Sequence, residues 1–279
     1  MKPAQASSTA KLIAASTILL ASDPLTREQV DPDAAAWCAQ LLSGSRMDRA
    51  LAWSAGYRPT AHVWKWLEQH THPGIVSHFA WRKRWIAQRC QPALAEDFER
   101  VVILGAGLDT LALRLSQITP KVEWIEVDHP ASQRAKQASL QNVSTSVRFL
   151  PLDLKHETLP ELASDKATML IIEGVLMYLP PAAVEHLLQT LQRWPCPRLR
   201  LVMSFMTRWP DGSTGFRPRS RWVESWLAWR GEPFCWSMAA ESAVEWMAER
   251  GFTTLELAPP LTTNPSVLAG ENLLYCERR

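Results

Sequence analysis

Two glycines that directly follow an apolar run are the first residues of this chain that could take part in chemistry. Residues 101–104 form a short, continuous apolar run, typical of a strand buried on both faces, and the run ends at Gly105 and Gly107. Glycines at such a turn let the backbone approach a ligand closely, and the helix that follows supplies oriented N–H groups. The pattern predicts a strand, a tight turn and a helix around part of a small molecule, although an ordinary strand-to-helix turn also fits two glycines.

An acidic residue follows at an informative distance. Residues 122–127 read as a second strand that ends on Asp128, about 20 residues beyond the glycines, where a carboxylate can accept hydrogen bonds from both hydroxyls of a ribose. The dinucleotide fingerprint requires a third glycine where this chain has Thr110, preceded by Asp109. A carboxylate there would repel a pyrophosphate but suits a cationic cofactor. Residues 99–130 therefore favour S-adenosylmethionine, which has a sulfonium and an ammonium, over NAD.

Two more carboxylates follow the next two predicted strands. Asp153 lies just beyond residues 147–150, where it could bind an adenine amino group or equally cap the next helix. Glu173 follows residues 168–172, at the carboxyl end of a strand, where open α/β sheets bind ligands. Because a buried carboxylate needs a cationic partner, we expect Glu173 to contact the cofactor ammonium.

Three consecutive cations precede the first strand of the core. Arg82, Lys83 and Arg84 lie within residues 77–85, near the entry to the core. A solvated basic helix face and a ligand site are both open interpretations of this segment.

The elements that must position these groups alternate along the chain as in an α/β protein. Residues 1–98 are predicted as an N-terminal helical cap of the same domain, and residues 99–279 as the cofactor-binding core. Helices are expected at 9–21, 33–42, 62–69, 74–90, 108–118, 130–140, 181–193 and 237–250, and later strands at 199–205, 252–257 and 272–276. Since no helix separates the last two strands, we expect one antiparallel strand at the sheet edge.

Residues 206–236 interrupt this alternation and are called the lid below. The segment interleaves arginines with aromatic residues: Arg208, Arg217, Arg219, Arg221 and Arg230 with Trp209, Phe216, Trp222, Trp226, Trp229 and Trp236. Such a pattern can bind single-stranded nucleic acid, or cover a substrate whose carboxylate the arginines hold, or simply pack on its own tryptophans. The net charge of only +2 favours the substrate lid over nucleic acid.

Composition sets the remaining limits. With 279 residues, of which 47% are apolar, the chain can bury the core of one large domain. Five widely spaced cysteines without a Cys-x-x-Cys pair indicate reduced thiols in the cytoplasm and no zinc site. Residues 12–21 have the length of a signal-peptide core, but serine and threonine interrupt them, and a helix start is favoured. We expect no metal, no membrane and no nucleic acid partner, and leave the oligomeric state open.

Several of these blocks together resemble a known family. Residues 105–110, 126–130 and 173–179, with Asp153 between them, are similar in order and spacing to the leucine carboxyl methyltransferase family, specifically its bacterial small-molecule O-methyltransferase branch. The resemblance covers residues 75–279 well and the N-terminal segment loosely. A match of several blocks is far more specific than one glycine motif.

The resemblance implies a class I methyltransferase fold, Rossmann-like and doubly wound with seven strands, and methyl transfer from S-adenosylmethionine to oxygen, commonly of a carboxylate. Six residues would contact the cofactor: Arg82 its carboxylate, Gly105 and Gly107 its methionine and ribose side, Asp128 the ribose hydroxyls, Asp153 the adenine amino group and Glu173 the ammonium region. One departure is that residues 15–20 lack a lysine that some members have in the N-terminal helix. The protein-phosphatase specificity of the eukaryotic branch is therefore not carried over.

The expected acceptor is a small organic acid. A carboxylate is already ionised at neutral pH and needs no general base, so Tyr178, Arg208 and His129 are candidates only for positioning it. An alcohol or phenol would need a base, for which His129 or His78 are the candidates. Two other classes stay open: an NAD-type Rossmann oxidoreductase, and a non-catalytic module that binds a cofactor or RNA.

Overall fold

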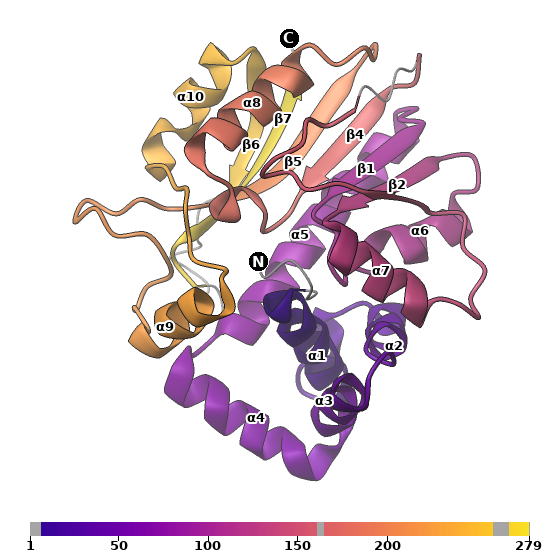
Figure 1. The fold of residues 1–279 in the computed structure, drawn as a ribbon, viewed down its shortest axis with the longest axis vertical. Coiled ribbons are helices and arrows are strands. Elements are labelled where there is room, and N and C mark those ends of the chain that lie inside the picture. The colour runs from indigo at the N-terminus through magenta and orange to yellow at the C-terminus, as the bar shows by residue number, and fades with distance from the viewer. Residues whose placement is uncertain (1–6, 161–164, 259–267, 279) are drawn as a thin grey trace.

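The centre of the protein is a seven-stranded sheet (Figure 1). The computed structural model describes residues 7–160, 165–258 and 268–278. Within these ranges the strands are β1 (Arg100–Leu104), β2 (Glu123–Asp128), β3 (Arg148–Pro151), β4 (Thr168–Ile172), β5 (Leu199–Met206), β6 (Phe252–Ala258) and β7 (Glu271–Arg278). Their order across the sheet is β3-β2-β1-β4-β5-β7-β6. Each strand predicted in the core is present within about two residues of its expected bounds.

The last strand corrects one expectation. Strands β1 to β5 pair in parallel, whereas β7 runs antiparallel between β5 and β6. The antiparallel strand was expected at the sheet edge, and this prediction was wrong, since β6 forms the edge. The burial of the two strands gives the reason: the first four residues of β7 are buried, so both of its faces are covered, while β6 is mostly half-buried or exposed.

Helices cover both faces of the sheet, as the doubly wound prediction requires. Side chains alternate along β1, so that Val101 and Ile103 join one apolar core, with α5 and α6, and Val102 and Leu104 join the other, with α8 and α10. The bounds of these helices and of α7 are Ile75–Ala95 for α5, Leu111–Ile118 for α6, Pro130–Ser139 for α7, Pro181–Gln192 for α8 and Ala243–Glu249 for α10. The strands of the core are thus buried between two layers.

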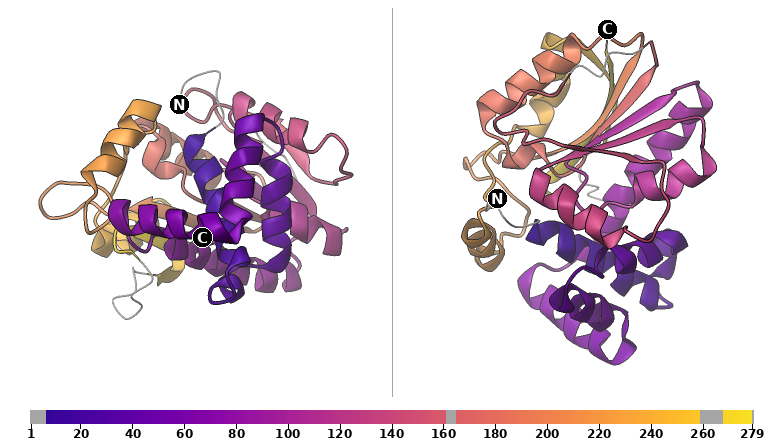
Figure 2. Two further views of the ribbon diagram at one scale, coloured as in Figure 1. Left: turned by 90° about the horizontal axis from the view of Figure 1, so that it is seen from below. Right: turned by 45° about the vertical axis from the view of Figure 1, so that its right-hand side comes forward.

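Further helices precede α5. They are α1 (Ser8–Ser22), α2 (Pro32–Leu41), α3 (Arg46–Gly56) and α4 (Arg58–Thr71), and Figures 1 and 2 show them gathered at one end of the sheet. Helix α3 was not predicted, although Met47, Leu51 and Ala55 form a short apolar stripe along it; of its residues only Ala55 is buried. Ala14 and Leu19 of α1 belong to the same apolar core as Val101. The division at residue 98 stays a prediction.

The lid contains α9 (Arg221–Arg230), the segment's one regular helix among the described residues. Isolated bridges join Thr207 to Met238, which brings the two ends of the lid together, and Arg217 to Ala269, which ties the lid to the residues before β7. Short 3-10 turns complete the described elements: η1 (Arg27–Gln29), η2 (Leu176–Tyr178) and η3 (Ala240–Ser242). No helix in the described ranges is long and apolar enough to cross a membrane.

Candidate functional site

A cavity of about 1300 Å³ lies at the carboxyl ends of β1, β2 and β4, between the N-terminal helices and the lid. Its volume exceeds the usual range for a single small ligand, about 300–1,000 Å³. All six residues that the resemblance assigns to the cofactor line it: Arg82, Gly105, Gly107, Asp128, Asp153 and Glu173. Tertiary structure therefore brings together groups that lie up to 91 residues apart, Arg82 and Glu173 being bonded to each other.

The glycine turn after β1 depends on the absence of side chains. Gly105 has φ +65°, and a Cβ there would lie 2.2 Å from Cγ2 of Val175. Gly107 has φ +50°, and its Cβ would lie 3.1 Å from that of Ala10 in α1. Glycine adopts a positive φ readily and has no side chain to collide with its neighbours. The turn can therefore pass close to Val175, to Ala10 and to a ligand.

Asp128, the last residue of β2, is fixed by two backbone donors. The N–H of Gly107 donates to Oδ2 and the N–H of His129 donates to Oδ1, each at 2.6 Å. Burial raises the pKa of Asp128, and these two hydrogen bonds partly oppose that rise. Each oxygen keeps a lone pair free to accept a further hydrogen bond, as the predicted ribose contact requires.

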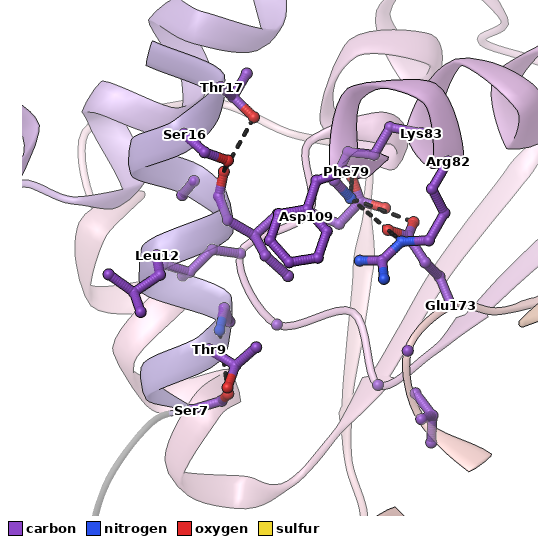
Figure 3. A pocket seen from close by; sticks show the side chains of 18 of the residues that line it. Ser7, Thr9, Leu12, Ser16, Thr17, Phe79, Arg82, Lys83, Asp109 and Glu173 are labelled. Carbon is purple, nitrogen blue, oxygen red and sulfur yellow. Dashed lines mark hydrogen bonds and ion pairs between the residues drawn. The ribbon is translucent and has the colours of Figure 1, made fainter. Parts of the chain in front are cut away.

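Arg82 of α5 is held by two carboxylates, of which Figure 3 shows that of Glu173 beside it. Its Nε donates to Oε1 of Glu173 at 2.8 Å, and its Nη1 donates to both oxygens of Glu271 at 2.9 Å. Arg82 is 4% exposed and Glu271 is fully buried. Burial by itself would lower the pKa of Arg82, but Glu271 and Glu173 raise it by more than burial lowers it. The pKa is raised overall, and the guanidinium stays charged. Burial would raise the pKa of Glu271, but Arg82 and then His78 lower it to about 2.

Lys83, the next residue of α5, reaches the same place. Its Nζ lies 3.1 Å from Oε1 of Glu173 and 3.2 Å from Oδ1 of Asp109. Burial would raise the pKa of Asp109, but the nearby ammonium of Lys83 contributes most to lowering it to about 2. The solvated-face interpretation of this segment is therefore wrong for Arg82 and Lys83, whereas Arg84 is exposed, although it too lines the cavity.

Lys83 and Glu271 are site residues that the sequence interpretation missed. Lys83 was hidden in a basic run that also suits a solvated helix face. Glu271 stands at the start of an apolar strand, where a charged side chain must have a cationic partner. That requirement was a usable signal, but the sequence did not identify Arg82 as the partner 189 residues away.

Asp153 and His129 lie together on the β2 and β3 side of the cavity. Oδ1 of Asp153 accepts from the N–H of Lys155 at 3.0 Å, which closes the turn after β3. Nδ1 of His129 accepts from the N–H of Ala131 at 3.2 Å and so caps α7. With Nδ1 as an acceptor, a neutral His129 carries its proton on Nε2, 3.9 Å from Oδ2 of Asp153. His129 is thus placed to donate a hydrogen bond rather than to act as a base.

The other positioning and base candidates differ in placement. Tyr178 lines the cavity, and burial raises the pKa of its hydroxyl, which keeps it neutral. Arg208 is not among the lining residues; it is exposed and donates to the carbonyl of Ser237 at 3.0 Å, so the structure does not bring it together with the other candidates. His78 is fully buried against Glu271, outside the lining, so no acceptor could reach it as a base.

The lid faces the cavity with apolar and acidic side chains. Those that line it include Phe216, Trp222, Val223, Trp226, Leu227, Glu224 and Glu232. Three of the arginines already have partners: Arg217 pairs with Asp211, Arg219 with the cavity-lining Glu224, and Arg230 with the hydroxyl of Ser8. In the structure these three arginines are thus paired within the protein, and the expectation that lid arginines hold a substrate carboxylate stays a prediction.

Known proteins are similar to this chain in both sequence and fold. A model of the leucine carboxyl methyltransferase family matches residues 9–192, more than half of the chain. A protein of Mycobacteroides abscessus with the provisional name S-adenosyl-L-methionine-dependent methyltransferase is 25% identical over 199 residues, which are 66% of this chain and 64% of that protein. A protein of Mycolicibacterium vanbaalenii with the same provisional name is 32% identical over 142 residues, 48% of this chain and 45% of that protein. The chain thus spans less than two thirds of the length of these relatives.

Among solved structures, a provisionally described O-methyltransferase of Nostoc punctiforme superposes with a TM-score of 0.52 and 13% identity, over 94% of this chain and 72% of that chain. At this identity the likeness concerns the fold alone. The predicted fold class is confirmed: an α/β, Rossmann-like class I methyltransferase fold with a doubly wound seven-stranded sheet.

Proposed function

We propose a function from one premise: this chain belongs to the leucine carboxyl methyltransferase family. Its proposed activity is transfer of a methyl group from S-adenosylmethionine to an oxygen nucleophile, the carboxylate of a small molecule. The observation that carries the proposal is the match of the family model across the residues that form the cofactor edge of the cavity.

The residues at this edge fit the cofactor. The glycine turn leaves room for a ligand close to the backbone, and Asp128 presents fixed carboxylate oxygens to a ribose. Asp153 lies beyond β3, on the side where an adenine ring would be held. Carboxylates at the end of β4 and after β1, Glu173 and Asp109, favour a cationic ligand over a phosphate-bearing one, which also argues against NAD.

The part of the cavity away from this edge suits an acceptor with an apolar body. Its walls are built largely from Leu12, Leu67, Ile75, Val76, Phe79, Phe216, Trp226 and Leu227. Leu12, Leu67 and Trp222 line the cavity and are also 38%, 42% and 80% exposed, so they form an apolar rim at its mouth. Exposed apolar side chains around an opening are typical of sites that admit apolar ligands.

When bound, S-adenosylmethionine supplies a methyl group activated by the sulfonium. The chain's own residues then have to align the acceptor oxygen and exclude water. The hydroxyl of Tyr178 and the Nε2 of His129 are two groups of the lining that could donate to a carboxylate and orient it. The aromatic side chains of the lid, Phe216 and Trp226, would shield the reacting groups from solvent.

A hydroxyl acceptor is the second candidate, and one observation favours it. His72 lines the cavity and is buried against Phe216, with ring centroids 5.3 Å apart, and its Nδ1 has no hydrogen-bond partner. Burial lowers the pKa of His72, so the ring is neutral at pH 7 and could accept a proton from an alcohol. His72 replaces His129 and His78 as the residue to test for base catalysis.

Labelled S-adenosylmethionine and a panel of aryl and alkyl acids separate the two candidates. Base-labile methyl esters are expected, and their yield should not depend on His72. If the label enters only base-stable ethers, and the variant His72→Ala abolishes it, the carboxylate acceptor is wrong. Titration with S-adenosylhomocysteine and, in parallel, NADH tests the cofactor itself, since only the former should bind.

A further inference from the structure

We infer that the protein docks peripherally on an anionic lipid bilayer through the outward faces of α3, α4 and α9. These faces are called the docking face below and are defined by six exposed side chains: Trp53, Tyr57, Val63, Trp66, Trp222 and Trp229. Docking does not depend on the proposed activity. It departs from the expectation that no membrane is a partner, which rested on the net charge of the whole chain and not on where the charges lie.

Exposed apolar side chains gather on one part of the molecule. Thirteen large ones are exposed among the described residues, and ten of these belong either to the segment before α5 or to the lid. Every exposed tryptophan in the described ranges is in this group: Trp53, Trp66, Trp222 and Trp229. Because soluble surfaces normally scatter such side chains singly, this concentration indicates contact with another apolar surface.

Helix α4 has its apolar side chains on the side away from the protein. Val63 and Trp66, three residues apart and thus on one face, are each 56% exposed. The charged Lys65 and Glu68 are half-buried instead, since Lys65 pairs with Asp23 and Glu68 accepts a backbone N–H of α5 at 3.0 Å. A helix that faced only water would bury its apolar face, so this arrangement is typical of a helix that lies on a lipid surface.

Helices α3 and α9 present aromatic side chains in the same way. Where α3 ends, Trp53 and Tyr57 are 62% and 47% exposed and stack on each other, with ring centroids 4.9 Å apart. On α9, Trp222 and Trp229 lie seven residues apart, on one face, and are 80% and 67% exposed. Tryptophan and tyrosine favour the boundary between hydrocarbon and water, because each joins an apolar ring to a polar N–H or O–H group.

The docking face adjoins the mouth of the cavity. Figure 1 shows α3 and α4 at one end of the molecule, with α9 beside one end of α4. Leu67 of α4 and Trp222 of α9 both line the cavity and are exposed at its rim. An apolar acceptor dissolved in the bilayer would therefore reach the cavity between these two helices, a route that rests on the proposed function.

The docking face is also the positive part of the chain. Residues 46–71, which hold α3 and α4, have four Lys or Arg residues and two acidic ones, a net charge of +2. The lid has five arginines and three acidic residues, again +2, so the rest of the chain, with 21 Lys or Arg and 23 acidic residues, has −2. Four exposed arginines lie in these segments near the aromatic rings: Arg46, Arg49, Arg58 and Arg221. Such a face attracts anionic headgroups, whereas a second copy of the chain would present the same positive face and be repelled.

Vesicle binding by the intact protein tests this inference. Vesicles of phosphatidylcholine mixed with phosphatidylglycerol should bind the protein, less tightly as salt is raised, and vesicles of phosphatidylcholine alone should bind it more weakly. Trp66→Ser should weaken binding to the anionic vesicles by about 10-fold or more, the factor expected when one large apolar side chain no longer enters lipid. Val63→Ser should act in the same direction. Arg58→Gln should weaken binding by about fivefold, and only on the anionic vesicles. Cosedimentation measures each partition constant.

A matched control keeps the test specific. Ile118→Ser removes a side chain that is 74% exposed at the end of α6, outside the docking face, and should bind vesicles as the wild type does. Melting curves show that each variant is folded. The inference is overturned if anionic vesicles do not bind the wild type, or if Trp66→Ser and Ile118→Ser bind alike. It is also overturned if the protein forms a dimer that Trp66→Ser dissociates, since a second copy would then cover the face. Binding of S-adenosylhomocysteine is measured without vesicles, so failure on vesicles leaves the proposed function standing.

Discussion

The carboxylate of Glu232, near the end of the lid, accepts a hydrogen bond of 2.6 Å from the hydroxyl of Thr9, in the first turn of α1. The same carboxylate accepts the backbone N–H of Ser8 at 3.3 Å, so it caps the start of that helix. Residues 223 positions apart thus join the lid to the N-terminal helices at the wall of the cavity. Glu232 and Thr9 both line that cavity.

Replacing Glu232 with Gln is expected to loosen the lid. The variant keeps the size of the side chain but loses its charge at a helix N-terminus, which should lower the free energy of unfolding by ~1–2 kcal/mol. Trypsin should then cleave faster at the lid arginines. Limited proteolysis with mass spectrometry checks this, with Glu224→Gln as a control, because Glu224 pairs only with the exposed Arg219. Equal cleavage rates in both variants would contradict the role of Glu232.

Replacing Gly105 with Ala should destabilise the protein by roughly 2–4 kcal/mol, since the new Cβ would lie 2.2 Å from Val175 and the backbone has φ +65°. Gly212→Ala is a matched control. Gly212 also has positive φ, +76°, but nothing lies within 4 Å of its Cβ position, so only the backbone cost of about 1 kcal/mol applies. Urea denaturation measures both. Similar losses in the two variants would show that Val175 yields to the added methyl group.

Replacing Asp128 with Asn should weaken binding of S-adenosylhomocysteine by about 10-fold or more, because the ribose would lose a charged acceptor. The amide nitrogen would also face one of the two backbone N–H donors that now bind the carboxylate. Calorimetry gives the dissociation constant, and a melting curve without ligand shows whether the fold is intact. An unchanged dissociation constant would exclude Asp128 from the ribose site.

The pair of Arg82 and Glu271 predicts an acid-sensitive fold. The pKa of Glu271 falls from an ordinary value of 4.5 to about 2, so the unfolded chain binds a proton at a higher pH than the folded one. Its contribution to stability is therefore complete above about pH 4.5 and is lost as the pH falls towards 2. Denaturant titrations between pH 6 and pH 2.5 should show this loss. Glu271→Gln should be less stable at pH 6 but lose less on acidification; a parallel decline in both proteins would assign the acid sensitivity to other carboxylates.

Local patterns in the sequence were sufficient to predict the strands of the sheet and the site residues that follow those strands. The apolar runs of β1 and β4, buried on both faces, have a length and composition that only a central parallel strand explains. The glycine turn at Gly105 and the carboxylates of Asp128, Asp153 and Glu173 follow strand ends directly. Because parallel strands end at one edge, their order along the chain already placed them together.

Other features became visible only in the tertiary structure, because they arise from contacts between segments that lie far apart in the sequence. The insertion of β7 between β5 and β6, the pairing of Glu271 with Arg82, and the direction of the lid arginines all depend on partners that no local pattern names. Arg82 and Lys83 look alike in the sequence. In the structure Arg82 is buried between Glu173 and Glu271, whereas Lys83 is partly exposed and contacts Glu173 and Asp109. The environment of a charge, and not its identity, decides which partners it has.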